Sequence, residues 1–320
     1  MSTNKPDIVV LGTIVFDIFV KGVSSFPKKG RAIPIEKFPY SIGGCGANSA
    51  LVLSQLGAKV SLIGSIGDDH FGNYIKKKLS ECNIRLELLS TKEKLPTSLS
   101  ILFISKKGER SYLHSSGANE KINLSDKALF QISSAKIFHI GGAMLFPGFD
   151  GKPMAKSLKY AKKNRTLTSV DLGWDTSNQW LKKLELSLPY IDILMMNEAE
   201  LKALTKKRKL ESAVNYLHDK GPKVIIIKLG ERGAFISKDI LKVHVPAIKT
   251  KVIDTTAAGD SFAAGFLFSL INGGNLIDSV KLGNTLGALT VQKFGSLTDS
   301  INLKSVMKFA KMHYDFNSLT

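Results

Sequence analysis

A seven-residue loop, 254–260, contains the residues of this chain that are best suited to chemistry. It reads Asp-Thr-Thr-Ala-Ala-Gly-Asp; a β-rich run, 249–253, precedes it, and an apolar stretch of helical length, 262–270, follows it. We therefore predict a loop that leads into a helix N-terminus, where free N–H groups and partial positive charge favour a bound phosphate. The small residues Ala257, Ala258 and Gly259 leave the backbone N–H groups of this predicted anion site uncovered.

Asp260 is the charged side chain within this predicted anion site. A carboxylate there needs a reason, because it repels the anion. It can serve as an ordinary N-terminal cap of the helix. It can also accept the proton of a hydroxyl group that attacks a bound phosphoryl group. The residues of the loop alone leave both roles open.

Two segments of the chain match one known family. The loop 254–260 resembles the C-terminal signature of the ribokinase-like (PfkB) carbohydrate kinases, Asp-Thr-x-(Gly/Ala)-Ala-Gly-Asp. The segment 43–72, from Gly-Gly-Cys-Gly-Ala-Asn to Gly-Asp-Asp-His-Phe-Gly, is similar to the N-terminal signature of that family. The resemblance implies an enzyme that transfers the γ-phosphoryl group of ATP to a carbohydrate hydroxyl with Mg²⁺ present. It also implies that Asp260 is the general base and that the backbone amides of Ala257, Ala258, Gly259 and Asp260 form the anion site.

Strand-like and helical segments alternate along the chain. This alternation predicts an α/β fold: a doubly wound, mostly parallel sheet flanked by helices, with ligands at the C-terminal ends of the strands. We expect one ribokinase-like domain, 1–320. The segment 154–163 has helical character, and the predicted strands are 7–12, 135–142, 166–171, 191–197 and 224–229.

Two further segments predict a small β-sheet lid. Residues 14–42 hold several Pro and Gly residues and little helical pattern, which favours short antiparallel strands and turns. Residues 97–118 contain two strand-like runs around Lys-Lys-Gly at 106–108, a hairpin signature. In the family that the chain resembles, such a lid closes over the sugar and can pair between subunits, so a homodimer through the lid is one expectation. Closure would exclude water as a competing phosphoryl acceptor.

Several polar residues near the N-terminus are candidates for substrate binding. Asp17 interrupts the apolar run 14–20, so it needs water or a ligand as a partner, unless it faces solvent. The family resemblance implies that four residues contact the sugar: Asp17, Gly43, Gly44 and Asn48. Val15 stands where ribokinases commonly have Asn, which makes ribose itself less favoured. No Arg lies at 171–175, where some relatives bind a sugar phosphate, so an unphosphorylated substrate is favoured.

The resemblance also implies a nucleotide site. The strand-like run 224–229 ends in a Gly-x-x-Gly turn that resembles the nucleotide-binding loop of the family. A predicted helix, 280–293, would bring Asn284 towards adenine. The implied nucleotide-binding residues are Asn197, Lys228, Gly230, Gly233 and Asn284.

Metal binding is implied at two places. Asn197 and Glu200 open a predicted helix, where acidic residues are common caps. Asn-x-x-Glu also resembles the family motif whose Glu arranges Mg²⁺. Glu200 would contact Mg²⁺ through a water molecule, because Mg²⁺ gives up its hydration shell reluctantly. Beside the anion site, Asp254, Thr256 and Gly295 resemble a monovalent-cation site, which would bind K⁺.

The composition is that of a globular enzyme. Apolar residues make up 43% of the 320 residues and charged residues 22%, and no window approaches about 18 uninterrupted apolar residues. The two cysteines, Cys45 and Cys82, cannot form a disulfide framework. No secretory signal pattern opens the chain, so we expect a cytoplasmic protein.

A formal net charge of +18 keeps nucleic-acid binding as an alternative. The lysines are dispersed in pairs, however, and the densest basic run, 206–209, has no interleaved aromatic residues. A solvated basic surface is the simpler interpretation. Two other functions stay open: a nucleoside (adenosine-like) kinase of the same family, and a non-catalytic binding protein on this fold.

Overall fold

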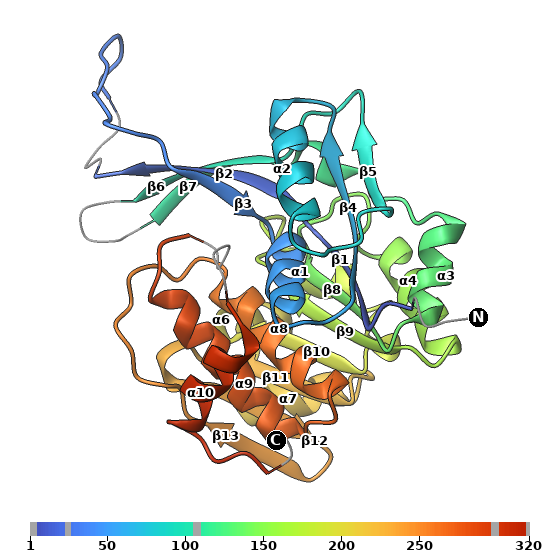
Figure 1. Ribbon diagram of the computed structural model, residues 1–320. Helices are drawn as coiled ribbons and strands as arrows, with labels where there is room; N and C mark the ends of the chain where they lie inside the picture. Colours follow the sequence, from blue (N-terminus) through green and yellow to red (C-terminus); the bar gives the residue numbers. More distant parts are fainter. Residues whose placement is uncertain (1–4, 23–26, 105–109, 296–300, 318–320) are drawn as a thin grey trace.

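The computed structural model describes residues 5–22, 27–104, 110–295 and 301–317, and its centre is one large sheet (Figure 1). The strand order is β13-β12-β11-β10-β9-β8-β1-β4-β5. The pairs from β11 through β10, β9, β8, β1 and β4 to β5 are parallel, whereas β12 and β13 join antiparallel at one edge. The strands are β1 (Ile8–Gly12), β4 (Val60–Gly67), β5 (Leu89–Lys92), β8 (Ile137–Ala143), β9 (Leu167–Leu172), β10 (Ile193–Asn197), β11 (Val224–Lys228), β12 (Ala234–Lys238) and β13 (Leu241–Val245).

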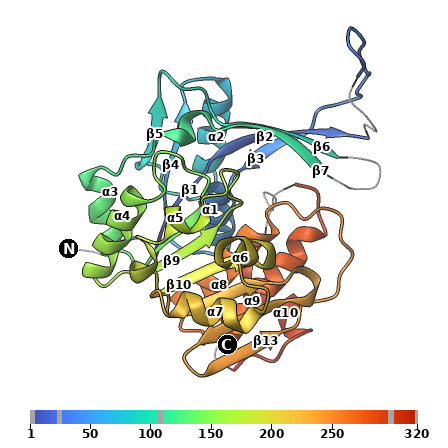
Figure 2. The same cartoon turned by 180° about the vertical axis from the view of Figure 1, so that it is seen from behind.

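Helices cover both faces of the large sheet, because its central strands are apolar on both sides. Along β1, Ile8 and Val10 pack in one core cluster and Val9 and Leu11 in another, as the alternation of side chains requires. The first cluster is covered by α1 (Cys45–Gln55), α2 (His70–Ser80), α8 (Ala258–Ile271), α9 (Leu276–Val291) and α10 (Leu303–Lys311). The second, seen from behind in Figure 2, is covered by α3 (Asp126–Ser134), α4 (Lys152–Lys163), α5 (Trp180–Leu184), α6 (Glu198–Thr205) and α7 (Leu210–His218).

The parallel strands point their C-terminal ends to one edge of the sheet. The loops at that edge lead into α6 after β10, while β11 ends at Lys228 and the 3₁₀ turn η3 (Gly230–Arg232) follows. In the register of the sheet, Asn197 at the end of β10 lies opposite Lys228. The residues predicted to bind nucleotide and metal therefore come from adjacent strand ends.

A second, four-stranded sheet extends from the body of the molecule (Figure 1). Its order is β3-β2-β6-β7, with β2 (Val15–Lys21), β3 (Tyr40–Gly43), β6 (Leu99–Ile104) and β7 (Arg110–Ser115). The two strands of the predicted hairpin pair antiparallel as β6 and β7. The predicted turn of this hairpin, 106–108, lies outside the described residues. The middle pair, β2 and β6, is parallel, which differs from the antiparallel strands expected for this sheet.

Buried polar contacts tie the base of the small sheet to the body. The side chain of Asn119 accepts a hydrogen bond from the Ile14 amide at 3.2 Å and donates one to the Ile14 carbonyl at 2.9 Å. The Asp69 carboxylate accepts hydrogen bonds from the Thr97 amide and hydroxyl, both at 2.7 Å. Ile14 directly precedes β2 and Thr97 lies two residues before β6, so these contacts position the start of both central strands of the small sheet.

The predicted fold class is confirmed: a mostly parallel sheet is flanked by helices and accompanied by a small β-sheet. Boundaries shift by a few residues; the helix predicted at 280–293 begins at Leu276, because Asn275 caps it through a 2.9 Å hydrogen bond from the Asp278 amide. Among the described residues, none of the helices combines the length and the apolar character needed to cross a membrane.

Candidate functional site

The predicted anion site lies at the N-terminus of α8. Ala257, the residue before the helix, has φ 59° and ψ 6°, a left-handed conformation that an Ala side chain disfavours. This turn directs the chain so that the amides of Gly259 and Asp260 fall in the first turn of α8, where the helix offers them no acceptor. The Ala258 amide donates to the Thr255 carbonyl at a long 3.4 Å. The loop is thus open to an anion at Gly259 and Asp260.

A cavity of about 640 Å³ starts at this helix end. Lys228, Thr255 and Gly259 lie at one part of its wall, and Asn284 lies at another. Both glycines of the predicted nucleotide loop, Gly230 and Gly233, also line it. Its volume is in the range of small-molecule sites. The cavity is further lined by small or apolar residues and by four charged or polar ones: Ala247, Ile248, Val252, Ala258, Phe262, Gly287, Ala288 and Val291, with Glu231, Arg232, Lys249 and Thr250.

Asp260 connects this cavity with the N-terminal candidates. Its carboxylate oxygen Oδ2 accepts a 2.7 Å hydrogen bond from Asn48 Nδ2, and its carbonyl accepts one from the Ser49 hydroxyl at 3.4 Å. Both donors belong to α1, more than 200 residues earlier in the chain. The N-termini of α1 and α8 therefore meet at Asp260, the residue after the cavity-lining Gly259.

Asp17 and Gly43 lie together on neighbouring strands of the small sheet. A Cβ atom at Gly43 would be 1.9 Å from Asp17 Oδ2, so only glycine admits the carboxylate here. Gly44 follows with φ 91° as the N-cap of α1, the helix that carries Asn48. The structure thus brings all four predicted substrate-binding residues into one region.

The Asp17 carboxyl is only 7% exposed, which is unusual for an ionisable group. Burial raises its pKa to about 7; a hydrogen bond from Ser100 opposes this rise, and the nearby charge of Asp260 adds to it. An alcohol that donates hydrogen bonds to the ionised form would stabilise it. The alternative of a solvent-facing Asp17 does not hold in this structure.

Lys228 forms a buried ion pair that the sequence analysis did not identify. Its Nζ atom lies 2.6 Å and 2.8 Å from the two carboxylate oxygens of Asp171, at the end of β9. Burial lowers the pKa of Lys228, but the carboxylates of Asp171, Glu200 and Asp260 raise it above its usual range, so the ammonium stays charged. A Cβ atom at Gly259 would lie 3.1 Å from this Nζ, which places the cation against the start of α8.

Asn197 and Glu200 form a reciprocal cap at the start of α6. The Glu200 amide donates to Asn197 Oδ1, and the Asn197 amide donates to Glu200 Oε2, both at 2.8 Å. The capping role considered for these residues is therefore present. Glu200 is 6% exposed, and burial raises its pKa while the charge of Lys228 lowers it. A carboxylate beside the cavity suits Mg²⁺ chemically, since Mg²⁺ prefers oxygen ligands.

The three candidates for a monovalent-cation site are joined by hydrogen bonds. Asp254 Oδ1 accepts from the Thr256 amide at 2.9 Å and from its hydroxyl at 2.8 Å. Asp254 Oδ2 accepts from the Gly295 amide at 2.9 Å. The carboxylate of Asp254 thus holds the loop before α8 against the segment after α9. K⁺ binding at this position stays a prediction.

Sequence analysis missed two features of the site: the ion pair of Asp171 with Lys228 and the hydrogen bond of Asn48 with Asp260. Asp171 was noted only for the lack of a nearby Arg. The signal for it was present, because Asp171 and Lys228 both end predicted strands of a parallel sheet, and such ends share one edge. The contact between Asn48 and Asp260 joins helices that no local pattern relates.

Three comparisons with known proteins agree on the family. A family model described as pfkB family carbohydrate kinase matches residues 5–302. Ribokinase of Haemophilus influenzae is 29% identical over 310 residues, which are 95% of this chain and 98% of that protein. A nucleoside kinase of Methanothermobacter thermautotrophicus is 27% identical, with 93% of each chain covered. The structure of Arabidopsis thaliana ribokinase complexed with ribose and ATP superposes with a TM-score of 0.85 at 28% identity, covering 96% of this chain and 99% of that one.

The burial of Asp17 predicts a stability that depends on pH. Its pKa of about 7 in the folded protein lies above the 3.8 of an exposed Asp, so raising the pH ionises the unfolded chain first and destabilises the fold. Asp17→Asn removes this cost. We therefore compare the free energy of unfolding of Asp17→Asn with that of the unaltered protein in urea titrations. The difference, variant minus unaltered protein, should be about 2–3 kcal/mol larger at pH 8 than at pH 5.

The matched control is Asp7→Asn. Burial raises the pKa of Asp7, but hydrogen bonds from Lys59 and Lys136 lower it by more, so the pKa of Asp7 lies below its usual value. That variant should gain no stability over this pH range. A constant difference between Asp17→Asn and the unaltered protein at both pH values would contradict a raised pKa at Asp17.

Proposed function

Since this chain belongs to the pfkB family of carbohydrate kinases, we propose that it transfers the γ-phosphoryl group of ATP to a primary hydroxyl of a small, unphosphorylated carbohydrate. The observation that carries the proposal is the position of Asp260. It directly follows Gly259, which lines the cavity, while its carboxylate accepts a hydrogen bond from Asn48 and lies near enough to Asp17 to raise the pKa of that carboxyl. A donor in the cavity and an acceptor at the polar group would meet at this carboxylate.

ATP fits the cavity with its phosphates at α8 and its base near α9. The amides of Gly259 and Asp260 and the charge of Lys228 favour the terminal phosphates. Asn284 and the small or apolar residues of α9 line one wall of the cavity away from the phosphates, which suits the flat base of a nucleotide. The related Arabidopsis thaliana ribokinase is complexed with ATP, which supports ATP as the phosphoryl donor.

The charge of the acceptor side favours a neutral sugar. The charge of Asp260 lies near enough to Asp17 to raise the pKa of the Asp17 carboxyl, so the acceptor side carries two carboxyl groups. Lys183 forms an ion pair with Asp175 at 2.8 Å, so its positive charge is already paired with a carboxylate. A sugar phosphate would be repelled by these carboxylates, whereas sugar hydroxyls can donate hydrogen bonds to them.

The reaction needs few protein groups. The sugar oxygen forms a bond to the γ-phosphorus as the bond to the β-phosphate oxygen breaks, and ADP leaves. Asp260 positions the hydroxyl and accepts its proton, with Asn48 orienting the carboxylate through Oδ2. In a loose transition state the proton leaves late, so positioning and the Gly259 and Asp260 amides contribute most.

Mg²⁺ would be held near Glu200 through water, and its contribution is to neutralise the charge of the phosphates. Asp254, Thr256 and Gly295 are joined by hydrogen bonds beside the anion site, and we assign these three residues to a K⁺ site. The small sheet, predicted at 14–42 and 97–118, is the lid that we expect to close over the sugar and exclude water. The lid and the large sheet form one domain in this proposal.

A homodimer through the lid is the proposed assembly. An aromatic groove of about 320 Å³ lies on the side of the small sheet that faces α2. Phe38 and Tyr40 in it are more than half exposed, at 54% and 56%. Apolar side chains of this size favour burial against a partner.

A nucleoside kinase is the alternative function, because a nucleoside kinase is among the relatives. The decisive experiment is a phosphorylation screen of pentoses, hexoses and nucleosides with ATP and Mg²⁺, with and without K⁺. We expect the largest kcat/KM for a neutral sugar. A preference for a nucleoside would replace the sugar assignment, and nucleotide binding without any transfer would favour a binding protein on this fold.

Asp260→Asn removes the proton acceptor but keeps the size of the side chain. We expect kcat to fall by about 10²–10⁴-fold, the usual effect of a positioned base, with little change in ATP affinity. Steady-state kinetics and calorimetric ATP titration measure the two quantities. Asp17→Ala is the matched variant on the acceptor side and should mainly raise the sugar KM. Near-normal turnover in Asp260→Asn would remove Asp260 from the mechanism.

Lys228→Met tests whether the buried cation serves phosphates as well as the fold. Loss of the ammonium leaves Asp171 unpaired, so we expect about 3–5 kcal/mol of destabilisation in chemical unfolding. The double variant with Asp171→Asn should recover much of that stability but not the kcat/KM for ATP. If the double variant also recovered activity, Lys228 would be structural only.

A further inference from the structure

One face of α9 forms the wall of the nucleotide cavity away from the phosphates. Asn284, Gly287, Ala288 and Val291 all line the cavity, and their spacing of three, four and seven residues places them on one side of the helix. Asn284 is the polar member of this face and is only 7% exposed. Its carboxamide is therefore the group of α9 that can form a directed hydrogen bond with a bound base.

The protein fixes which end of this carboxamide is available. Asn284 Nδ2 donates to the Val245 carbonyl at 3.2 Å and to the Pro246 carbonyl at 3.1 Å. Carbonyl oxygens only accept hydrogen bonds, so the nitrogen must face them and the oxygen must point elsewhere. Ala247, the next residue of this strand exit, lines the cavity itself. The orientation of Asn284 thus follows from two main-chain groups at the cavity edge.

Tyr314 completes this arrangement from the C-terminal segment. Its hydroxyl accepts a 3.3 Å hydrogen bond from Asn284 Nδ2 and donates its proton to the Pro246 carbonyl. Because that single proton is committed to Pro246, the hydroxyl can offer Asn284 only a lone pair. All three neighbours of the Asn284 nitrogen are therefore acceptors.

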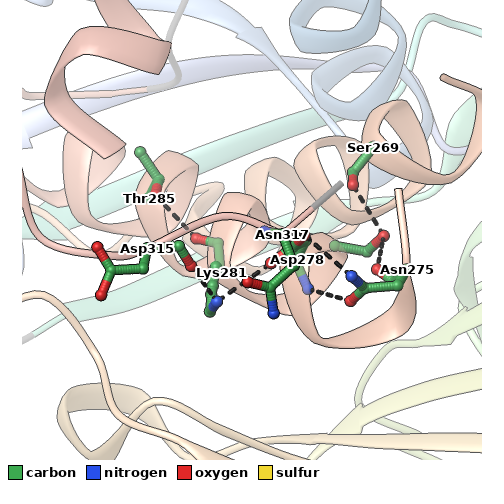
Figure 3. Close-up of polar contacts among 8 residues, drawn as sticks. Ser269, Asn275, Asp278, Lys281, Thr285, Asp315 and Asn317 are labelled. Carbon is green, nitrogen blue, oxygen red and sulfur yellow. Dashed lines mark hydrogen bonds and ion pairs between the residues drawn. The ribbon is translucent and has the colours of Figure 1, made fainter. Parts of the chain in front are cut away.

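The segment that carries Tyr314 is fastened to the first turn of α9 (Figure 3). The fully buried carboxylate of Asp278 accepts hydrogen bonds from the Asn317 amide at 2.9 Å and from Asn275 Nδ2 at 3.0 Å. Lys281 bridges Asp278, at 3.1 Å, and the Asp315 carbonyl. These contacts hold the residues that follow Tyr314 against the helix that carries Asn284.

We propose that the C-terminal segment 312–317 is a specificity element of the nucleotide site. Through Tyr314 it holds Asn284 with the carboxamide oxygen towards the bound base. This oxygen accepts a hydrogen bond from the amino group at C6 of adenine, whereas a 6-oxo purine presents an acceptor at the same position. The Asn284 oxygen and the 6-oxo oxygen would then face each other without a proton between them. Neither buried acceptor would be hydrogen-bonded, which disfavours binding of the 6-oxo base. Tyr314 is a positioning residue, and the inference rests on the proposed nucleotide site.

Calorimetric titration with ADP and inosine diphosphate tests the proposal, because these two nucleotides differ in the base at C6 and N1 only. We expect the unaltered protein to bind ADP about tenfold more tightly than inosine diphosphate. Asn284→Ala should bring the two affinities within about twofold of each other. Tyr314→Phe, which retains the ring and removes the hydroxyl, should reduce the preference by about threefold.

Tyr160→Phe is the matched control, since Tyr160 is a partly buried tyrosine on the opposite face of the sheet, and it should leave the preference unchanged. Equal affinities in the unaltered protein, or a preference that survives both Asn284→Ala and Tyr314→Phe, would overturn the proposal. Equal weakening of both nucleotides in Tyr314→Phe would also overturn it, as this is the result of a purely structural role. Binding is measured without a sugar, so failure of the kinase assignment would appear separately, as ADP binding without phosphoryl transfer.

Discussion

The largely buried ammonium group of Lys228 balances the negative charge of the carboxylates around the candidate site. Asp171 contacts it directly, and Glu200 and Asp260 lie near enough to raise its pKa. Buried carboxylates without a cation are costly, so the strand ends that carry them must converge on the lysine. The parallel sheet provides this convergence, because the ends of β9, β10 and β11 share one edge. The N-terminus of α8 adds partial positive charge at the same place.

The same arrangement explains why the site combines distant parts of the chain. Asp17 and Asn48 come from the first 48 residues, whereas Asp260 opens a helix near the end. The hydrogen bond of Asn48 to Asp260 joins these parts. A change in how α1 sits against α8 would therefore move the acceptor group and the proposed base together. Asn119 and Asp69 hold the base of the small sheet, which carries Asp17, against the body of the molecule.

Much of the site follows from local sequence, and the remainder depends on contacts between distant segments. The strand–loop–helix around 254–260 and the alternation of strands and helices were predicted because each is a local pattern. The parallel pairing of β2 with β6 was not, since it joins residues about 80 positions apart and no turn specifies it. The partner of Lys228 and the left-handed turn at Ala257 likewise depend on packing. Orientation of the Asn284 carboxamide requires the carbonyls of a separate strand exit, which a sequence does not display.

Phosphorus NMR of the reaction with ATP and the best acceptor tests the central claim most directly, because it identifies both the group that is transferred and the oxygen that receives it. The account predicts ADP and a sugar phosphate in equal amounts, with the new phosphorus signal split by the two protons of a CH₂ group. Release of inorganic phosphate alone, or a phosphorus coupled to a single ring proton, would contradict the proposed transfer to a primary hydroxyl at Asp260.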